Sequence, residues 1–184
     1  MKIYKMAICA LFTVLTAVLS QIAIPIGPVP INLATFAVFC AGALLGSKLG
    51  VLSLTVFVAL GAFGMPVFAM FRGGIGTLAG PTGGYIVGYI PAAFLIGLII
   101  EKWGRNNKIF SHPVAMLAGM LACFTLGTAW FMFSTNTELW ASLTICVLPF
   151  LPGEFIKIAA ATIVAKRLRP ALQISSNHAA SFPQ

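Results

Sequence analysis

Apolar segments that could enter a lipid bilayer follow one another along almost the whole chain. Six of them lie at about 4–23, 31–46, 49–63, 84–100, 113–133 and 153–168. Only 8% of the 184 residues are charged, whereas a soluble domain carries about 25%. Because a full span needs about 20 residues, the shorter segments favour a compact bundle. The sequence therefore predicts an all-α integral membrane protein, a compact bundle of six transmembrane helices.

Basic residues are distributed unequally between the two ends of these segments. With six crossings, Arg72 lies alone on one side and Lys157 lies inside a segment. The other nine share the opposite side: Lys2, Lys5, Lys48, Lys102, Arg105, Lys108, Lys166, Arg167 and Arg169. Cytoplasmic loops carry such an excess, so we predict cytoplasmic termini in a bacterial inner or plasma membrane. The same scatter argues against nucleic-acid binding, despite a net charge of +8.

The segments imply one domain. We expect a membrane domain over residues 1–169 and a polar, disordered tail over 170–184. The first segment resembles a signal peptide, but similar segments recur, so we expect a retained first helix. Residues 139–148 are apolar but too short to span a bilayer. They form either a re-entrant piece or an extension of the last helix through a kink at Pro149 and Pro152.

Glu154 and Lys157 lie three residues apart in an otherwise uncharged apolar stretch. An ionisable residue there costs roughly 2.5–3.5 kcal/mol on insertion scales, so two together indicate a functional site. They follow Pro152 and Gly153, which predicts a place in the first turn of a helix, where unpaired N–H groups attract anions. The pair could instead be a purely internal ion pair that fixes helix packing.

A glycine-rich connection precedes the fourth segment. It contains six glycines between Arg72 and Tyr85 and matches neither a P-loop nor a dinucleotide-binding motif. Long connections of this kind form lids or binding loops when they are not simply flexible. We assign Arg72, Gly74, Thr82, Gly83 and Tyr85 to a binding site, with Tyr85 as a wall. Tyr85 and Tyr89 could alternatively belong to an interfacial aromatic belt.

Small residues recur every four positions in the first segment, at Cys9, Thr13 and Ala17. Such a stripe permits close helix packing, either inside the bundle or against a partner protein. We assign the three residues to partner docking. The chain has only three acids and none of the common hydrolase or metalloprotease motifs, so we predict no catalytic residues, no metal site and no cofactor.

Three motifs resemble the BioY family, the biotin-binding S components of energy-coupling factor (ECF) transporters. They are GPTGGYIVGY at Gly80–Tyr89, LPFLPGEFIKI at Leu148–Ile158 and PVPINLATFAVF at Pro28–Phe39. Many members have Asp in place of Glu154 and Gln in place of Ala34. With Ala34 here, we expect Asn32 to supply the hydrogen bond at that position.

The resemblance implies biotin uptake from the outer face. Lys157 would contact the carboxylate of biotin and Glu154 its ureido N–H donors, and the connection from Arg72 to Tyr85 would close over it. Cys9, Thr13 and Ala17 would face a transmembrane T component that works with two cytoplasmic ATPases, or the chain would act alone or by self-association. The alternatives are an S component for another vitamin and a structural subunit without transport activity.

Overall fold

Helices account for most of the chain, whose computed structural model describes residues 2–25, 27–103 and 110–180. The long helices are α1 (Lys2–Gln21), α2 (Ala34–Ala62), α4 (Gly83–Trp103), α5 (Ser111–Thr135) and α7 (Leu151–Ala180). The short elements are the 3₁₀ turn η1 (Ala69–Phe71), α3 (Ile75–Ala79) and α6 (Leu139–Cys146). Two short antiparallel strands, β1 (Ala23–Ile24) and β2 (Ile31–Asn32), connect α1 to α2. Arg105 and Lys108, two of the predicted cytoplasmic charges, lie outside the described residues.

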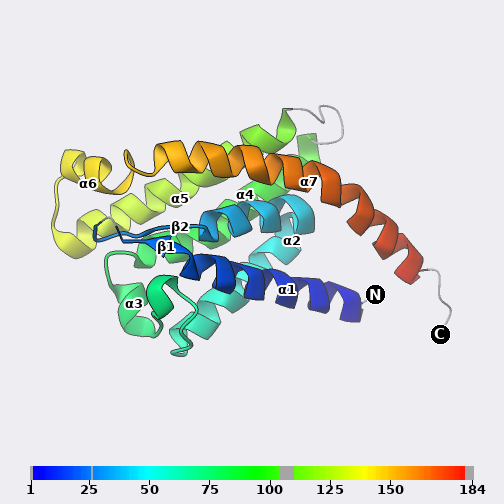
Figure 1. The fold of residues 1–184 in the computed structure, drawn as a ribbon, viewed down its shortest axis with the longest axis horizontal. Coiled ribbons are helices and arrows are strands. Elements are labelled where there is room, and N and C mark those ends of the chain that lie inside the picture. The colour runs from blue at the N-terminus through cyan, green and yellow to red at the C-terminus, as the bar shows by residue number, and fades with distance from the viewer. Residues whose placement is uncertain (1, 26, 104–109, 181–184) are drawn as a thin grey trace.

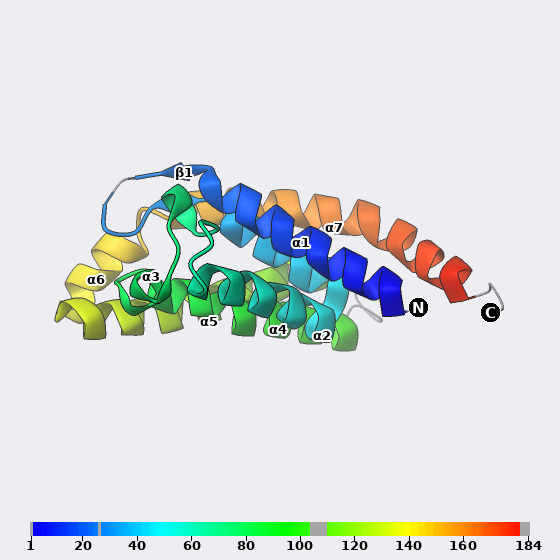
Figure 2. The ribbon, with the colours of Figure 1, turned by 90° about the horizontal axis from the view of Figure 1, so that it is seen from below.

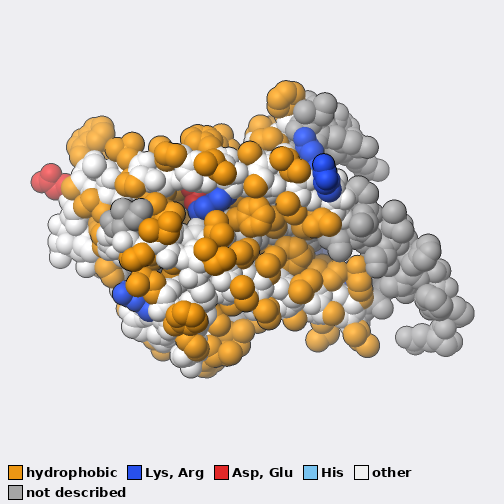
Figure 3. Space-filling view, in the orientation of Figure 1, with side chains coloured by type: hydrophobic (Ala, Val, Ile, Leu, Met, Phe, Trp, Pro, Cys, Tyr) orange, Lys and Arg blue, Asp and Glu red, His pale blue; other side chains and the backbone are white. Residues whose placement is uncertain are grey.

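Four of the described helices, α1, α2, α4 and α5, are long and apolar enough to cross a membrane. Together, α6 and α7 up to Leu168 pass the same test as a pair bent by 51°. The bend falls between Cys146 and Leu151, where Pro149 cannot donate a backbone hydrogen bond. The helices therefore support the predicted all-α membrane fold, and hydrophobic side chains cover much of the face seen in Figure 3.

The long helix α2 is a hairpin rather than one continuous rod. Gly46 has φ 80° and ψ −175°, which breaks the helix. A Cβ on Gly50 would lie 3.2 Å from the Ala41 carbonyl oxygen and 3.4 Å from the Gly42 Cα. Residues nine positions apart in a straight helix are about 13 Å apart, so the two halves must fold back on each other. The predicted segments 31–46 and 49–63 thus correspond to two helices on either side of Gly46, both drawn as part of α2 in Figure 1.

Glu101, near the end of α4, caps the second half of this hairpin. Its Oε1 accepts the backbone N–H of Ser47 at 2.7 Å, and its Oε2 accepts the Ser47 hydroxyl at 2.9 Å. An acceptor at this position satisfies an otherwise unpaired N–H, and its negative charge favours the helix N-terminus. The sequence analysis gave Glu101 no role, since nothing in the sequence places it beside Ser47.

We expect Glu101→Ala to lower the free energy of unfolding by about 1–3 kcal/mol, because hydrogen bonds to a charged group are lost. Thermal unfolding of the purified protein in detergent measures the effect. Glu138→Ala is the matched control, since Glu138 is exposed and makes no capping hydrogen bond to α6. Equal midpoints for the two variants would mean that the cap contributes nothing.

The start of α1 and the end of α7 lie at one end of the bundle, and β1, β2, α3 and α6 lie at the other (Figures 1 and 2). The central helix α4 packs against both α2 and α5. The connection 63–82 holds η1 and α3. The helix α7 runs past Pro170 to Ala180, where a disordered tail was expected from the sequence.

Candidate binding site

A cavity opens at the end of the bundle that holds the short elements. Its wall is formed by the end of α1, β2 and the residues before it, both halves of α2, the connection 63–82, α4, α5 and the start of α7. The lining residues are Ser20, Val29, Pro30, Asn32, Thr35, Phe57, Phe68, Ala69, Met70, Arg72, Thr77, Thr82, Tyr85, Ile86, Tyr89, Cys123, Phe124, Phe150, Glu154 and Lys157. Most of these side chains are apolar or aromatic, and a few polar groups converge among them, as in many small-molecule sites.

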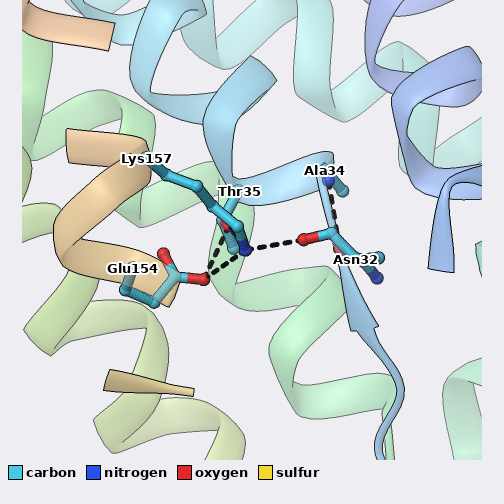
Figure 4. A network of polar contacts seen from close by, with 5 residues as sticks. All are labelled: Asn32, Ala34, Thr35, Glu154 and Lys157. Atoms are coloured by element: carbon cyan, nitrogen blue, oxygen red, sulfur yellow. Dashed lines mark hydrogen bonds and ion pairs between the residues drawn. The ribbon is translucent and has the colours of Figure 1, made fainter. Parts of the chain in front are cut away.

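Glu154 and Lys157 form a buried ion pair in this wall (Figure 4). The Lys157 Nζ lies 2.7 Å from the Glu154 Oε1, and the side chains of Lys157 and Glu154 are only 9% and 2% exposed. Thr35 joins the pair, because its hydroxyl donates to Glu154 Oε1 at 2.8 Å and accepts from Lys157 at 3.0 Å. Lys157 also donates to the backbone carbonyl of Asn32 at 2.6 Å. Three elements, β2, α2 and α7, are therefore joined at one point.

The network leaves one polar atom of the pair unused. An ammonium group has three donors, and Lys157 engages them with Asn32, Thr35 and Glu154. The Glu154 Oε2 is buried and finds no hydrogen-bond partner in the described part of the chain. A buried carboxylate oxygen without a partner is costly. The site is therefore complementary to a ligand that donates a hydrogen bond to Glu154.

Glu154 lies in the first turn of α7, as the sequence predicts. The predicted unpaired N–H groups are largely absent, which corrects that part of the anion-site hypothesis. The Leu151 N–H bonds the Val147 carbonyl, and the Glu154 N–H bonds the Phe150 carbonyl. Pro152 has no N–H to offer. The turn at 147–150 thus satisfies the Leu151 and Glu154 N–H groups, which a ligand carboxylate would otherwise use.

Aromatic side chains form much of the cavity wall. The Tyr85 hydroxyl is 2.9 Å from Thr128 Oγ1, and its ring meets Phe124 edge-on with centroids 6.3 Å apart. Tyr89 lies one turn further along α4, with its ring 6.4 Å from that of Phe57. Both tyrosines are buried. Their burial among packed rings disfavours the interfacial-belt alternative and fits a wall against an apolar ring of the ligand.

The comparisons with known proteins agree on one family. Residues 1–174 match the model of the BioY family. The chain belongs to the BioY family. It is 40% identical over 169 residues to a probable biotin transporter BioY of Pyrococcus horikoshii, covering 92% of this chain and 98% of the relative. It is 39% identical over 159 residues to the biotin transporter BioY of Thermotoga maritima, covering 86% and 92%.

A solved crystal structure, described as the S component for biotin from an ECF-type ABC transporter, has the same fold. The TM-score is 0.86 at 34% identity, and the match covers 92% of each chain. BioY membership confirms the resemblance inferred from the three motifs. Those motifs also hold the Glu154–Lys157 pair, Asn32 and Tyr85, which the structure brings to one cavity.

The structure brings six of the eight predicted BioY binding residues to the cavity: Asn32, Arg72, Thr82, Tyr85, Glu154 and Lys157. Gly74 and Gly83 do not line it. Gly74 has φ +87° at the start of α3, and a Cβ on Gly83 would overlap the Leu78 carbonyl, so both shape the backbone of the connection. The Asn32 Oδ1 accepts the Ala34 N–H at 3.0 Å, a contact within the chain, so the hydrogen bond expected from Asn32 to a ligand stays a prediction.

Thr35 is the most informative residue that sequence reasoning missed. It bonds both members of the ion pair, yet no motif argument singled it out. A signal was available, because Thr35 is a polar residue of the BioY-like PVPINLATFAVF motif. The Asn32 contact with Lys157 comes from its backbone carbonyl, which no side-chain pattern predicts.

The partner-docking assignment does not fit the contacts of α1. Cys9 and Thr13 are buried, and the Thr13 hydroxyl bonds the Ser53 carbonyl at 2.9 Å. The Cys9 thiol lies 3.6 Å from the Leu49 carbonyl oxygen. Ala17 is only partly exposed and packs against the core. This stripe lets α1 pack closely on α2 within the protein, which was the alternative interpretation of the same spacing.

Proposed function

We propose that this protein takes up biotin as the substrate-binding S component of an ECF transporter. The observation that carries the proposal is the buried Glu154–Lys157 pair in an aromatic cavity, within a chain of the BioY family. The relatives are named biotin transporters, and the matching crystal structure is described as an S component for biotin. The protein is thus a transporter component and not an enzyme.

Biotin has three chemical parts that match different parts of the cavity. Its ureido ring carries two N–H donors, which fit the open Glu154 Oε2. Its apolar thiophane ring fits the wall formed by Tyr85, Tyr89 and Phe68. Its valerate ends in a carboxylate, which needs a cation or hydrogen-bond donors. We infer that the ureido group lies at Glu154 and that the valerate points toward the connection 63–82.

Arg72 is the cation we assign to the valerate carboxylate. It lies in the connection, lines the cavity, and its guanidinium makes no hydrogen bond or ion pair with another described residue. Lys157 was the partner expected from the sequence, but its three donors are already engaged. Lys157 could reach a carboxylate only by releasing one of those acceptors. A guanidinium can bind a carboxylate through two parallel hydrogen bonds.

The Arg72 assignment is tested with biotin and biotinamide, which lacks the negative charge. We expect Arg72→Gln to weaken biotin binding about 10- to 100-fold, since a charge-assisted hydrogen bond is lost. Biotinamide binding should change by less than about threefold. Equilibrium binding to the purified protein measures both, with Lys48→Gln, a change at an exposed lysine outside the cavity, as control. If Arg72→Gln weakens the binding of biotin and biotinamide equally, Lys157 and not Arg72 is the partner of the valerate carboxylate.

A wider ligand panel tests the substrate itself. Biotin should outcompete other vitamins by orders of magnitude, because only the correct ligand satisfies Glu154 Oε2 without leaving a buried acceptor unpaired. Stronger binding of a different vitamin would show an S component with another substrate. No binding of any ligand in the panel would favour a structural subunit.

We further propose six crossings with cytoplasmic termini in the plasma membrane. The reversal of α2 at Gly46 supplies two crossings, and the bent α6–α7 pair supplies one. Together with α1, α4 and α5 they make the six predicted from the sequence. An even number places both termini on one side, in line with the excess of basic residues there. A C-terminal reporter that is active outside the cell would contradict this.

The cavity then faces outward, because the short elements that line it lie at the end opposite the start of α1 and the end of α7 (Figure 1). Residues 1–169 would form the membrane domain, and the end of α7 would extend into the cytoplasm. The T component and two cytoplasmic ATPases are the partners we assign, with self-association as the arrangement of a chain that works alone. Co-purification of tagged protein from its native membrane distinguishes the two arrangements.

A further inference from the structure

The end of α1 is hydrogen-bonded to the connection that covers the cavity. We use the name lid for residues 63–82. Gln21 contacts both sides of a tight loop in the lid, because its Nε2 lies 3.3 Å from the Pro66 carbonyl and its Oε1 accepts the Phe71 N–H at 2.8 Å. The neighbouring Ser20 hydroxyl lies 2.5 Å from the Val67 carbonyl. Figure 2 shows this part of the lid beside the end of α1.

The loop held by Gln21 has a strained backbone. Met70 and Phe71 have φ of 60° and 57°, in the left-handed region that non-glycine residues rarely adopt. Such residues persist only where surrounding contacts enforce them. The Phe68 N–H bonds the Arg72 carbonyl at 3.0 Å, which closes the loop on itself. Outside the loop, the bonds from Ser20 and Gln21 are the polar contacts that hold it in place among the described residues.

This loop also carries part of the cavity wall. Phe68, Ala69, Met70 and Arg72 all line the cavity. The far end of the lid is held separately, since the Trp130 Nε1 donates to the Gly80 carbonyl at 3.0 Å. The lid is therefore held by α1 near one end and by Trp130 near the other. The Gly74 N–H also bonds the Gly61 carbonyl at 2.6 Å, and the buried Phe68 ring packs edge-on against Phe57. Release of the α1 contact would loosen the strained backbone around Met70 and Phe71, which lines that side of the cavity.

We propose that Gln21 is a positioning residue that latches the lid to α1 and sets how long the ligand stays bound. This inference rests on the proposed binding function. Gln21 itself does not line the cavity, so it acts through the lid. An open lid mainly raises the rate at which bound ligand leaves the cavity. The latch therefore affects the dissociation rate of the ligand more than its association rate. Movement of α1 relative to the lid would then couple the rest of the transporter to ligand release.

Gln21→Met tests the latch, since methionine keeps the length of the side chain and removes its hydrogen bonds. We expect biotin to dissociate about tenfold faster, with an association rate within about threefold of the wild type. Amide hydrogen exchange in the absence of ligand should rise at residues 66–72 and stay unchanged elsewhere. Thr125→Val is the matched control, because the Thr125 hydroxyl is exposed and bonds only its own helix at Leu121.

Two results would overturn the latch: unchanged dissociation and exchange, or faster exchange across the whole chain, which would indicate a general structural role. Ser20→Ala provides a second variant, expected to act in the same direction through the Val67 contact. If the wild-type protein does not bind biotin, the proposed function fails. The exchange at residues 66–72 then still decides whether Gln21 holds the lid.

Discussion

Replacing Lys157 by methionine is expected to lower the free energy of unfolding by about 3–5 kcal/mol. The reason is that Glu154 is almost fully buried and its Oε1 lies 2.7 Å from the ammonium group. Removal of the cation leaves an uncompensated buried carboxylate with only the Thr35 hydroxyl for support. The Asn32 carbonyl loses its partner as well. Thermal or denaturant unfolding in detergent measures the loss.

The control for this prediction is Lys48→Met. It removes the same charge and replaces it with the same side chain, but at an exposed position outside the cavity. Its stability should stay within about 0.5 kcal/mol of the wild type. If Lys157→Met unfolds at the wild-type midpoint, Glu154 and Lys157 do not form the buried pair seen in the structure.

The membrane fold and much of the site could be predicted because they depend on local sequence. Apolar segments mark helices wherever they stand, and two charges within one such segment are costly enough to stand out at Glu154 and Lys157. Even the short segments on either side of Gly46 were separated correctly, because the Gly-Ser-Lys sequence there interrupts the hydrophobic run. Each of these signals lies within a few residues of the feature it predicts.

What could not be predicted depends on contacts between distant segments. Thr35 and Glu154 are 119 positions apart, and Ser47 and Glu101 are 54 apart. A single sequence does not show that such residues meet. The docking stripe illustrates the same point, because the spacing of Cys9 and Thr13 defines a face of α1 but not what covers it. Only the packing of α2 on that face decides between the two interpretations.

The two roles considered for the Glu154–Lys157 pair, ligand contact and internal packing, are separated by removing both charges together. Glu154→Met/Lys157→Met replaces the pair with apolar side chains of similar length. We expect it to recover most of the stability lost in Lys157→Met, because neutral replacement of a buried ion pair is often tolerated. Comparison of the single and double variants gives the coupling free energy within the pair.

Biotin binding should not recover in the double variant. The acceptor that we assign to the ureido N–H groups is the Glu154 Oε2, and methionine offers none there. Loss of a buried charged hydrogen-bond partner costs about 2–5 kcal/mol, which corresponds to affinity reduced by about 30-fold to several thousand-fold. Calorimetry or radioligand binding on folded, monodisperse protein measures it. A double variant that is stable and binds biotin with wild-type affinity would restrict the pair to a packing role, and the ligand site would have to be sought among Arg72 and the aromatic wall.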